Sequence, residues 1–162
     1  MTAIPDRASP ADATGALGLR TVHRLIQLGE RLKAYSVETL APLEIRPRHY
    51  NVLMLVESTD APSQQDLSRA LGIDPNVMVS LIDDLEVMGL VRRAPNPRDR
   101  RRHAIGMTAA GRGLLRRANT LATAAEAAVL GQVSPDELAV LHDVAGRLLA
   151  SSWETGMPKP TS

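Results

Sequence analysis

The sequence predicts a mainly α-helical fold with one small β-hairpin: a winged helix-turn-helix that has further helices before and after it. Two short amphipathic stretches lie on either side of Gly72, which is the spacing of a helix-turn-helix. Two strand-like stretches follow, and the loop between them, PNPRDRRR, is almost entirely arginine and proline. The 162 residues have the length of a single domain, so we expect these elements to share one core.

The composition excludes several kinds of site. The chain has no cysteine, which excludes disulfides, zinc–thiolate sites, a cysteine nucleophile and a thiol redox switch. It has no Phe, two Tyr and one Trp, which argues against aromatic stacking on single-stranded nucleic acid. His103 and His142 lack metal-ligand spacing, and we predict neither a metal site nor a cofactor. The sequence has no apolar run long enough for a signal peptide or a membrane span, so we expect a cytoplasmic protein without a membrane partner.

Charge is distributed unevenly along the chain. Although the net charge is only +1, six of the 19 basic residues and one acid lie between Arg92 and Arg102, a local charge of +5. The remaining 13 basic and 17 acidic residues give −4. Eleven residues therefore produce a positive field that the rest of the chain opposes, and an anionic partner would relieve their mutual repulsion.

The first helices are predicted from apolar spacing and from proline positions. Residues 1–15 contain prolines and show no pattern, so we expect a disordered tail. Apolar residues recur at helical spacing over residues 17–40, and Pro42 ends that helix. Pro47 suits the first turn of a second helix, which we place at residues 48–58.

Capping residues delimit the helix pair. Ser63 and Asp66 resemble a capping box that opens the first helix of the pair. Gly72 can take the left-handed conformation that ends it, while Asp74 and Pro75 suit the cap and first turn of the second helix. In that second helix, positions three and four apart form one predicted core stripe: Met78, Leu81, Ile82, Leu85 and Met88. Its outer face carries Asn76, Ser80, Asp83 and Val87, with Val77 and Val79 at the flanks.

The remaining elements are a hairpin and two helices. Gly89 ends the second helix, and residues 90–94 and 103–107 are the predicted strands. The prolines between them exclude a tight turn, so this loop should project as a wing with Arg98, Arg100 and Arg101 at its tip. Thr108 is expected to cap a long alanine-rich helix that reaches about Gly131. The box SPDE at 134–137 opens a last helix to about Trp153, and residues 154–162 form a tail.

A polar-faced helix followed by a cationic hairpin suits double-stranded DNA. The major groove admits one α-helix, and arginines bind phosphates or enter a narrow minor groove. On the helix, Asn76 can read adenine and Ser80 is permissive, whereas Val77 and Val79 can touch only thymine methyls or sugars. With so few donors there, we expect affinity to rest mainly on the wing. Asp83 either accepts from cytosine or forms a salt bridge with an arginine of the protein, and we favour the salt bridge.

The segments 67–93, LSRALGIDPNVMVSLIDDLEVMGLVRR, and 96–111, NPRDRRRHAIGMTAAG, closely resemble the MarR family of bacterial transcriptional regulators. In that family the wing reads as a Pro, an Asp-x-Arg, a short strand and then Thr-x-x-Gly. This chain matches at Pro97, Asp99, Arg101, Thr108 and Gly111, and the resemblance covers about residues 17–153. It departs from the family at Val77, Val79, Ser80 and Asp84, where relatives often have Thr or Ser and Arg or Lys. These departures shift the predicted readout toward DNA shape and backbone contacts.

The resemblance implies a homodimer on a pseudo-palindromic operator, which we expect to repress, and release by a small anionic or aromatic ligand. Residues 16–153 would form one domain, in which 16–40 and 108–153 dimerise and 46–107 form the DNA-binding lobe. The expected DNA contacts are Ser63 and Gln64, then Pro75, Asn76, Val77, Val79 and Ser80, and in the wing Arg93, Arg98, Arg100, Arg101 and Arg102, with Asp99 orienting the wing. The family's ligand pocket would lie near His23, Arg48, His49 and Tyr50, whose alternative role is as surface or interface residues.

Two other functions compete with this interpretation. A winged-helix module that binds proteins instead of DNA would suit the acids Asp83 and Asp84 and the apolar Val77 and Val79. A small enzyme would need a nucleophile with a base, paired carboxylates or a metal cluster. The adjacent acids, Asp83 and Asp84, should diverge on a helix surface, so we predict that the protein is not an enzyme.

Overall fold

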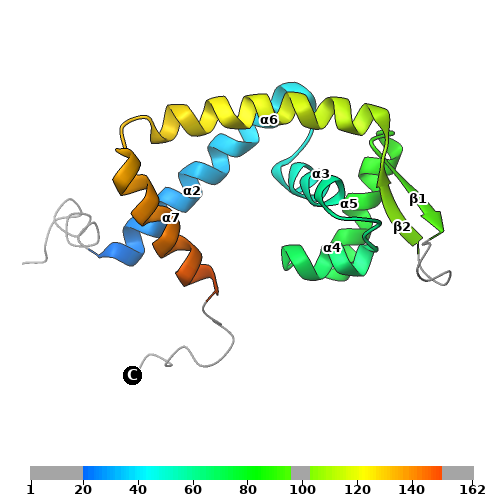
Figure 1. The fold of residues 1–162 in the computed structure, drawn as a ribbon, viewed down its shortest axis with the longest axis horizontal. Coiled ribbons are helices and arrows are strands. Elements are labelled where there is room, and N and C mark those ends of the chain that lie inside the picture. Colours follow the sequence, from blue (N-terminus) through cyan, green and yellow to red (C-terminus); the bar gives the residue numbers. More distant parts are fainter. Residues whose placement is uncertain (1–19, 96–102, 151–162) are drawn as a thin grey trace, which may run out of the picture. The chain divides into compact units, whose positions relative to one another are not determined.

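A computed structural model describes residues 20–95 and 103–150 (Figure 1). The predicted tails, 1–15 and 154–162, lie outside these residues, as do Trp153 and most of the loop between the strands. The chain divides into two compact units, the first ending at Ala122 and the second beginning at Thr123, within one long helix. The first unit contains the helix pair and the hairpin, so it is the unit that carries the candidate site.

The first described helix, α2 (Thr21–Leu40), ends where the sequence predicts. Pro42 lies in a short 3-10 turn, η1 (Ala41–Leu43), which closes at Glu44 in the left-handed conformation with φ +56°. Leu40 is the buried residue of α2, and apolar side chains farther toward its start are exposed: Val22, Leu25, Ile26, Leu28 and Leu32. Only the end of this helix therefore belongs to the core of the first unit.

Helix α3 (Pro47–Ser58) confirms the second predicted helix, including proline in its first turn. It buries Val52, Leu53 and Val56 in the core. Tyr50, at its start, is half-buried, and its hydroxyl donates a 3.0 Å hydrogen bond to Oδ1 of Asn119 on the long helix. Helix α3 is thus held both by the core and by a polar contact across its outer edge.

Helices α4 (Gln64–Leu71) and α5 (Pro75–Val87) form the predicted pair. The Ser63 hydroxyl accepts from the Asp66 amide at 3.3 Å, and the Ser63 amide donates to the Asp66 carboxylate at 3.0 Å, which confirms the capping box. Gly72 ends α4 at φ +60°, a conformation in which a side chain would be strained. Oδ1 of Asp74 accepts from the Asn76 amide at 2.8 Å and so caps α5 as predicted.

The core stripe of α5 is confirmed at four of its five predicted positions: Met78, Leu81, Ile82 and Leu85 are buried. Met88 was predicted there, but 38% of its surface is exposed. The prediction is wrong at this residue because α5 ends at Val87 and the chain reverses at Gly89, which has φ +70°. Met88 therefore occupies the C-cap, outside the buried face of the helix.

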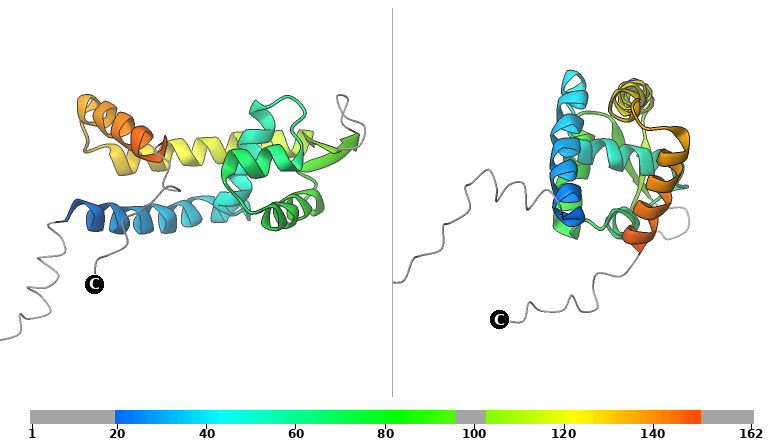
Figure 2. Two further views of the ribbon diagram at one scale, coloured as in Figure 1. Left: turned by 90° about the horizontal axis from the view of Figure 1, so that it is seen from below. Right: turned by 90° about the vertical axis from the view of Figure 1, so that its left-hand side faces the viewer.

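Strands β1 (Val91–Pro95) and β2 (His103–Met107) pair antiparallel, with Val91 opposite Met107. β1 begins one residue later than predicted, because the buried Leu90 belongs to the connection from α5. The Ile105 amide donates to the Pro62 carbonyl at 2.8 Å, so the hairpin is also attached to the segment that precedes α4. In the left view of Figure 2 the hairpin runs directly into the start of the long helix.

The long helix, α6 (Ala109–Leu130), begins at the predicted cap. The Thr108 hydroxyl oxygen accepts from the Gly111 amide at 3.0 Å. Helix α7 (Pro135–Ala150) opens with the predicted capping box, in which the Ser134 amide donates to Glu137 at 2.9 Å. Residues 20–95 and 103–150 include no helix that has both the length and the apolar character needed to cross a membrane.

Candidate nucleic-acid interface

The N-terminal half of α5 presents the predicted reading residues to solvent. Asn76, Val77, Val79 and Ser80 are all exposed, whereas Met78 between them is fully buried. The Ser80 hydroxyl lies 3.4 Å from the Asn76 carbonyl oxygen of the preceding turn and donates to it. The exposed surface of these four side chains is therefore available to a partner.

Asp83 on α5 forms the salt bridge that the sequence favoured. The Arg93 guanidinium donates to Oδ1 of Asp83 at 2.6 Å and also to the carboxylate of Glu86. The Arg93 amide donates to Oε1 of Glu86 at 3.1 Å. Burial lowers the pKa of Arg93, but the hydrogen bonds to the two carboxylates outweigh it and raise the pKa above its ordinary value. Arg93 therefore joins β1 to α5 and fixes the base of the hairpin against the helix.

Asp84 makes a second connection, on a different side of α5. Its Oδ2 atom accepts from the Arg46 guanidinium at 3.2 Å and lies 3.4 Å from Nε2 of His49. Arg46 is the N-cap of α3 and His49 lies in its first turn. The two neighbouring acids thus point to different partners, as predicted, and together they hold α5 against both α3 and the hairpin.

This arrangement also shifts the pKa of His49. Only 3% of its surface is exposed, and its Nδ1 atom accepts from the Arg46 amide at 3.3 Å. Nε2 must therefore carry the proton of the neutral ring, although it makes no well-aligned hydrogen bond with a described residue. Burial, and then the charge of Arg46, lower the pKa of His49, while Asp84 opposes the shift only in part. The ring is thus held in its neutral form, as an acceptor for the α3 cap.

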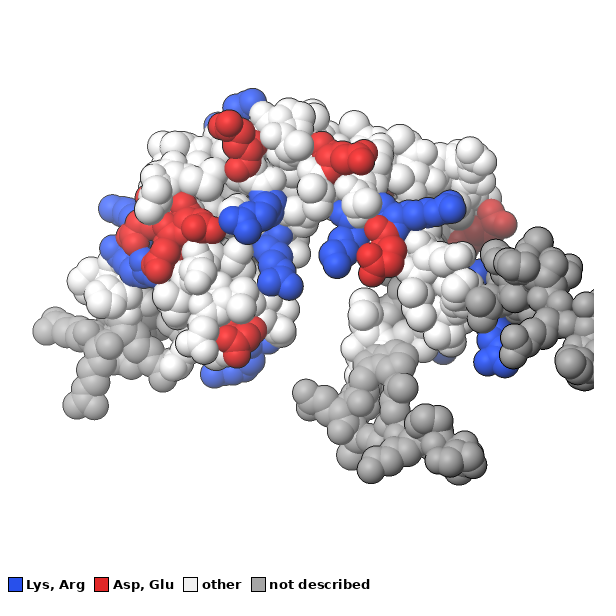
Figure 3. Space-filling view, turned by 180° about the vertical axis from the view of Figure 1, so that it is seen from behind, with Lys and Arg blue, Asp and Glu red and all other residues white. Residues whose placement is uncertain are grey.

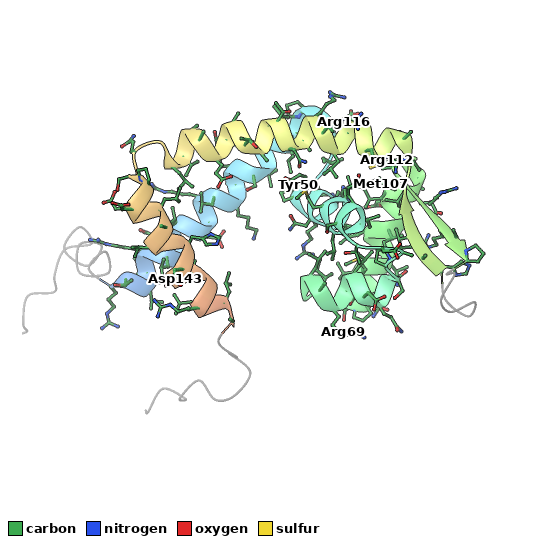
Figure 4. All side chains as sticks on the ribbon, viewed as in Figure 1. Tyr50, Arg69, Met107, Arg112, Arg116 and Asp143 are labelled. Atoms are coloured by element: carbon green, nitrogen blue, oxygen red, sulfur yellow. The ribbon has the colours of Figure 1, made fainter. Side chains whose placement is uncertain are left out.

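The four predicted pocket residues do not gather in one place within the chain. His49 faces Asp84 on α5, whereas Tyr50 bonds to Asn119 on α6 (Figure 4), so these neighbours lie on different sides of α3. Arg48 is exposed, and His23 lies 17 residues before Leu40, about 25 Å away along α2. The family resemblance placed these four residues near a pocket, and sequence reasoning did not identify the cluster of Arg46, His49 and Asp84.

The other predicted contacts have different surroundings. Ser63 is buried and its hydroxyl is engaged with Asp66, while Gln64 is half-buried and Pro75 is exposed. In the wing, Arg98, Asp99, Arg100, Arg101 and Arg102 lie outside the described residues. On the face shown in Figure 3, acidic side chains lie directly beside basic ones at several places. Most of the residues that give the local charge of +5 between Arg92 and Arg102 lie outside the described residues.

An exposed second helix, a glycine turn and a hairpin attached to that helix define a winged helix-turn-helix protein. A family model described as "MarR family" matches residues 43–102, which include both helices of the pair and β1. Over these residues the chain is similar to the MarR family.

Two relatives, one of them solved in two complexes, show the extent of this similarity. The "Multiple antibiotic resistance protein MarR" of Escherichia coli (strain K12) is 28% identical over 102 residues, which are 63% of this chain and 69% of that protein. The crystal structure of CouR from Rhodococcus jostii RHA1, bound to p-coumaroyl-CoA, has a TM-score of 0.75 and 29% identity, covering 88% of this chain and 98% of CouR. The transcriptional repressor CouR bound to a 23-mer DNA duplex has a TM-score of 0.79 and 26% identity, covering 89% of this chain and 99% of that chain.

Proposed function

We propose that this protein is a sequence-specific, DNA-binding transcriptional regulator, which acts as a homodimer on a pseudo-palindromic operator and represses transcription. The observation that carries the proposal is the exposed start of α5, held in a fixed position beside the hairpin by Arg93. The likeness to CouR on DNA supports it, because that repressor has the same fold over nearly its whole length. The proposed activity is binding, not catalysis, and its place is the cytoplasm.

Exposed apolar side chains support the homodimer. In the first unit these lie on α2, and in the second unit α7 exposes Val140, Leu141, Leu148 and Leu149. Apolar surface of this extent on helices is typically buried against a partner, and burial contributes about 25 cal/mol per Å². Two copies would then place two α5 helices about one turn of DNA apart, roughly 34 Å. Light scattering should give twice the mass of the 17.4 kDa chain.

DNA selection from genomic fragments, followed by gel-shift titration, tests the main proposal. If six to eight arginines of the dimer contact phosphates, log K should fall with log salt at a slope of about −5 to −7. Arg100→Gln with Arg101→Gln should weaken binding to every sequence, while Arg147→Gln should not. Arg147 is a suitable control because it is exposed and, among the described residues, forms an ion pair with Asp143 one turn earlier on the same helix. Failure to retain any genomic DNA, or an affinity independent of salt, would reject the proposal.

Two finer points remain proposals. CouR was crystallised with p-coumaroyl-CoA, and we propose that an anionic or aromatic ligand likewise regulates this protein, with Arg48 and Tyr50 as first candidates for contact. A shift in thermal stability with aromatic acids and their thioesters, lost in Tyr50→Phe or Arg48→Gln, would test this. The alternative function, a protein-binding winged helix, is favoured by the exposed Val77 and Val79. Two results together would support that alternative. The parent protein would bind no DNA, and a variant in which Arg100 and Arg101 are replaced would still bind its protein partner.

A further inference from the structure

We propose that Val77 and Val79 on α5 recognise the C5-methyl groups of thymine, and that these contacts select thymine at the operator positions that they reach. The inference rests on the proposed DNA-binding function and specifies how the operator is read. In the major groove the thymine methyl is the one apolar feature of the base edges, and it suits a side chain that carries no hydrogen-bonding group.

The first support is the lack of donors on α5. From Pro75 to Val87 the helix contains no Lys, Arg, Gln or His, so the bidentate recognition of guanine by a cation has no candidate there. Asn76 is the side chain that can make a bidentate contact, with adenine. Ser80 already donates to the Asn76 carbonyl of its own helix at 3.4 Å. Hydrogen bonding from α5 can therefore specify about one base pair of each half-site.

The second support is that the acidic side chains of α5 are paired with arginines of the protein. Asp83 and Glu86 bind Arg93, and Asp84 binds Arg46, so each carboxylate is paired with an arginine of the fold. These pairs lie beyond the second turn of the helix, whereas Val77 and Val79 lie in the first turn and a half. The N-terminal part of α5, which would enter the groove, therefore has no charged side chain after the capping Asp74. Apolar contact is then the main interaction available to it.

The third support is the geometry of the two valines. Each keeps 37% of its surface exposed, although Met78 between them is fully buried. Two residues apart on a helix, they lie about 160° apart around its axis and so flank Asn76 and Ser80. They can therefore contact bases on either side of the helix in the groove. Val87 offers an internal comparison: it is 89% exposed, but it lies about 12 Å farther along the helix than Val79.

Replacement of thymine by deoxyuridine tests the inference directly, since it removes only the methyl group. In the selected operator, replacing a T that contacts Val77 or Val79 by U should lower the affinity about fourfold. This is the effect expected from losing the burial of one methyl-sized group. The same replacement in the flanking DNA should have no effect. This arm uses the wild-type protein, so its result cannot be attributed to misfolding.

Protein variants, each measured on the T and the U operator, provide the second test. Val79→Ala should weaken binding to the T operator but not to the matched U operator, and Val77→Ala should behave likewise at its own position. Val87→Ala, on the same face but far from the start of α5, should bind both operators like the parent. Equal losses on T and U operators, or U substitution without effect while salt-dependent binding persists, would overturn the inference and leave the proposed function intact. Absence of binding to any duplex would instead overturn the proposed function.

Discussion

Gly111 on α6 offers the sharpest test of how the wing is attached to the fold. A Cβ atom placed on this glycine would lie 2.1 Å from the Leu90 carbonyl oxygen and 2.6 Å from the sulfur of Met107. The Met107 side chain can rotate away. The Leu90 carbonyl has little freedom, because it accepts from both the amide and the hydroxyl of Thr108, each at 3.1 Å. Gly111→Ala must therefore displace the connection between α5 and β1.

The expected cost follows from two opposing effects. Overpacking of a well-packed site costs about 1–3 kcal/mol, and contact with backbone atoms favours the upper part of that range. Alanine recovers up to about 1 kcal/mol of helix propensity. We therefore expect Gly111→Ala to lower the free energy of unfolding by about 1–2 kcal/mol. Gly113→Ala is the matched control, because its Cβ would meet nothing nearer than the Arg116 guanidinium at 3.9 Å. This variant should be more stable than the parent by about 0.5–1 kcal/mol.

Urea denaturation followed by circular dichroism measures both variants, at one protein concentration because a dimer's stability depends on it. The two variants should fall on opposite sides of the parent and differ by about 1.5–3 kcal/mol, because the helix-propensity gain is common to both and only Gly111→Ala is overpacked. If Gly111→Ala proves as stable as Gly113→Ala, the Leu90 carbonyl is not the constraint that we describe, and the junction of α5, β1 and α6 is looser than the distances indicate.

Three further predictions concern the residues around this junction and the second clamp. Thr108→Ala should cost about 1 kcal/mol in unfolding free energy by urea titration, because it removes the α6 cap, whereas Thr108→Ser should retain most of it. Arg93→Met should cost about 1 kcal/mol, since partly exposed pairs contribute little, and should weaken DNA binding in gel shifts; an unchanged affinity would contradict its role in holding the hairpin. The pKa of His49 is lowered by burial and Arg46, so the stability that neutral His49 contributes is fully present above pH 6.5 and is lost as pH falls through the folded-state pKa. Urea midpoints measured across acidic pH should show this loss, and the dependence on pH should be smaller in His49→Gln; an unchanged dependence would contradict the assignment to His49.

The elements whose signals are local in sequence were predicted well. The capping boxes at Ser63 and Ser134, the left-handed Gly72 and the Thr108 cap each involve residues within a few positions of one another, so the sequence contains both partners side by side. Asp83 was predicted to bind an arginine because a free carboxylate near DNA phosphates is unfavourable, although its partner could not be named.

Long-range features were harder to predict. Arg46 and Asp84 are 38 residues apart, and only the packing of α3 on α5 brings them together. His49 was placed near a ligand pocket by the family resemblance, and its hydrogen bond from the Arg46 amide at the start of α3 was not predicted. Met88 continued the apolar spacing of α5 beyond the residue at which the helix ends. In each case the deciding factor was the path of the chain, which residue spacing alone does not contain.

The division of labour along α5 has a consequence for how specificity can change. The contacts that hold this helix in the fold come from its buried stripe and from Asp83, Asp84 and Glu86. Asn76, Val77, Val79 and Ser80 take almost no part in them, and substitutions at such surface positions usually alter stability by less than about 0.5 kcal/mol. New combinations at these four positions can thus be sampled, by evolution or in a library, without first stabilising the protein. The anchored scaffold and the variable reading surface share one helix but not the same residues.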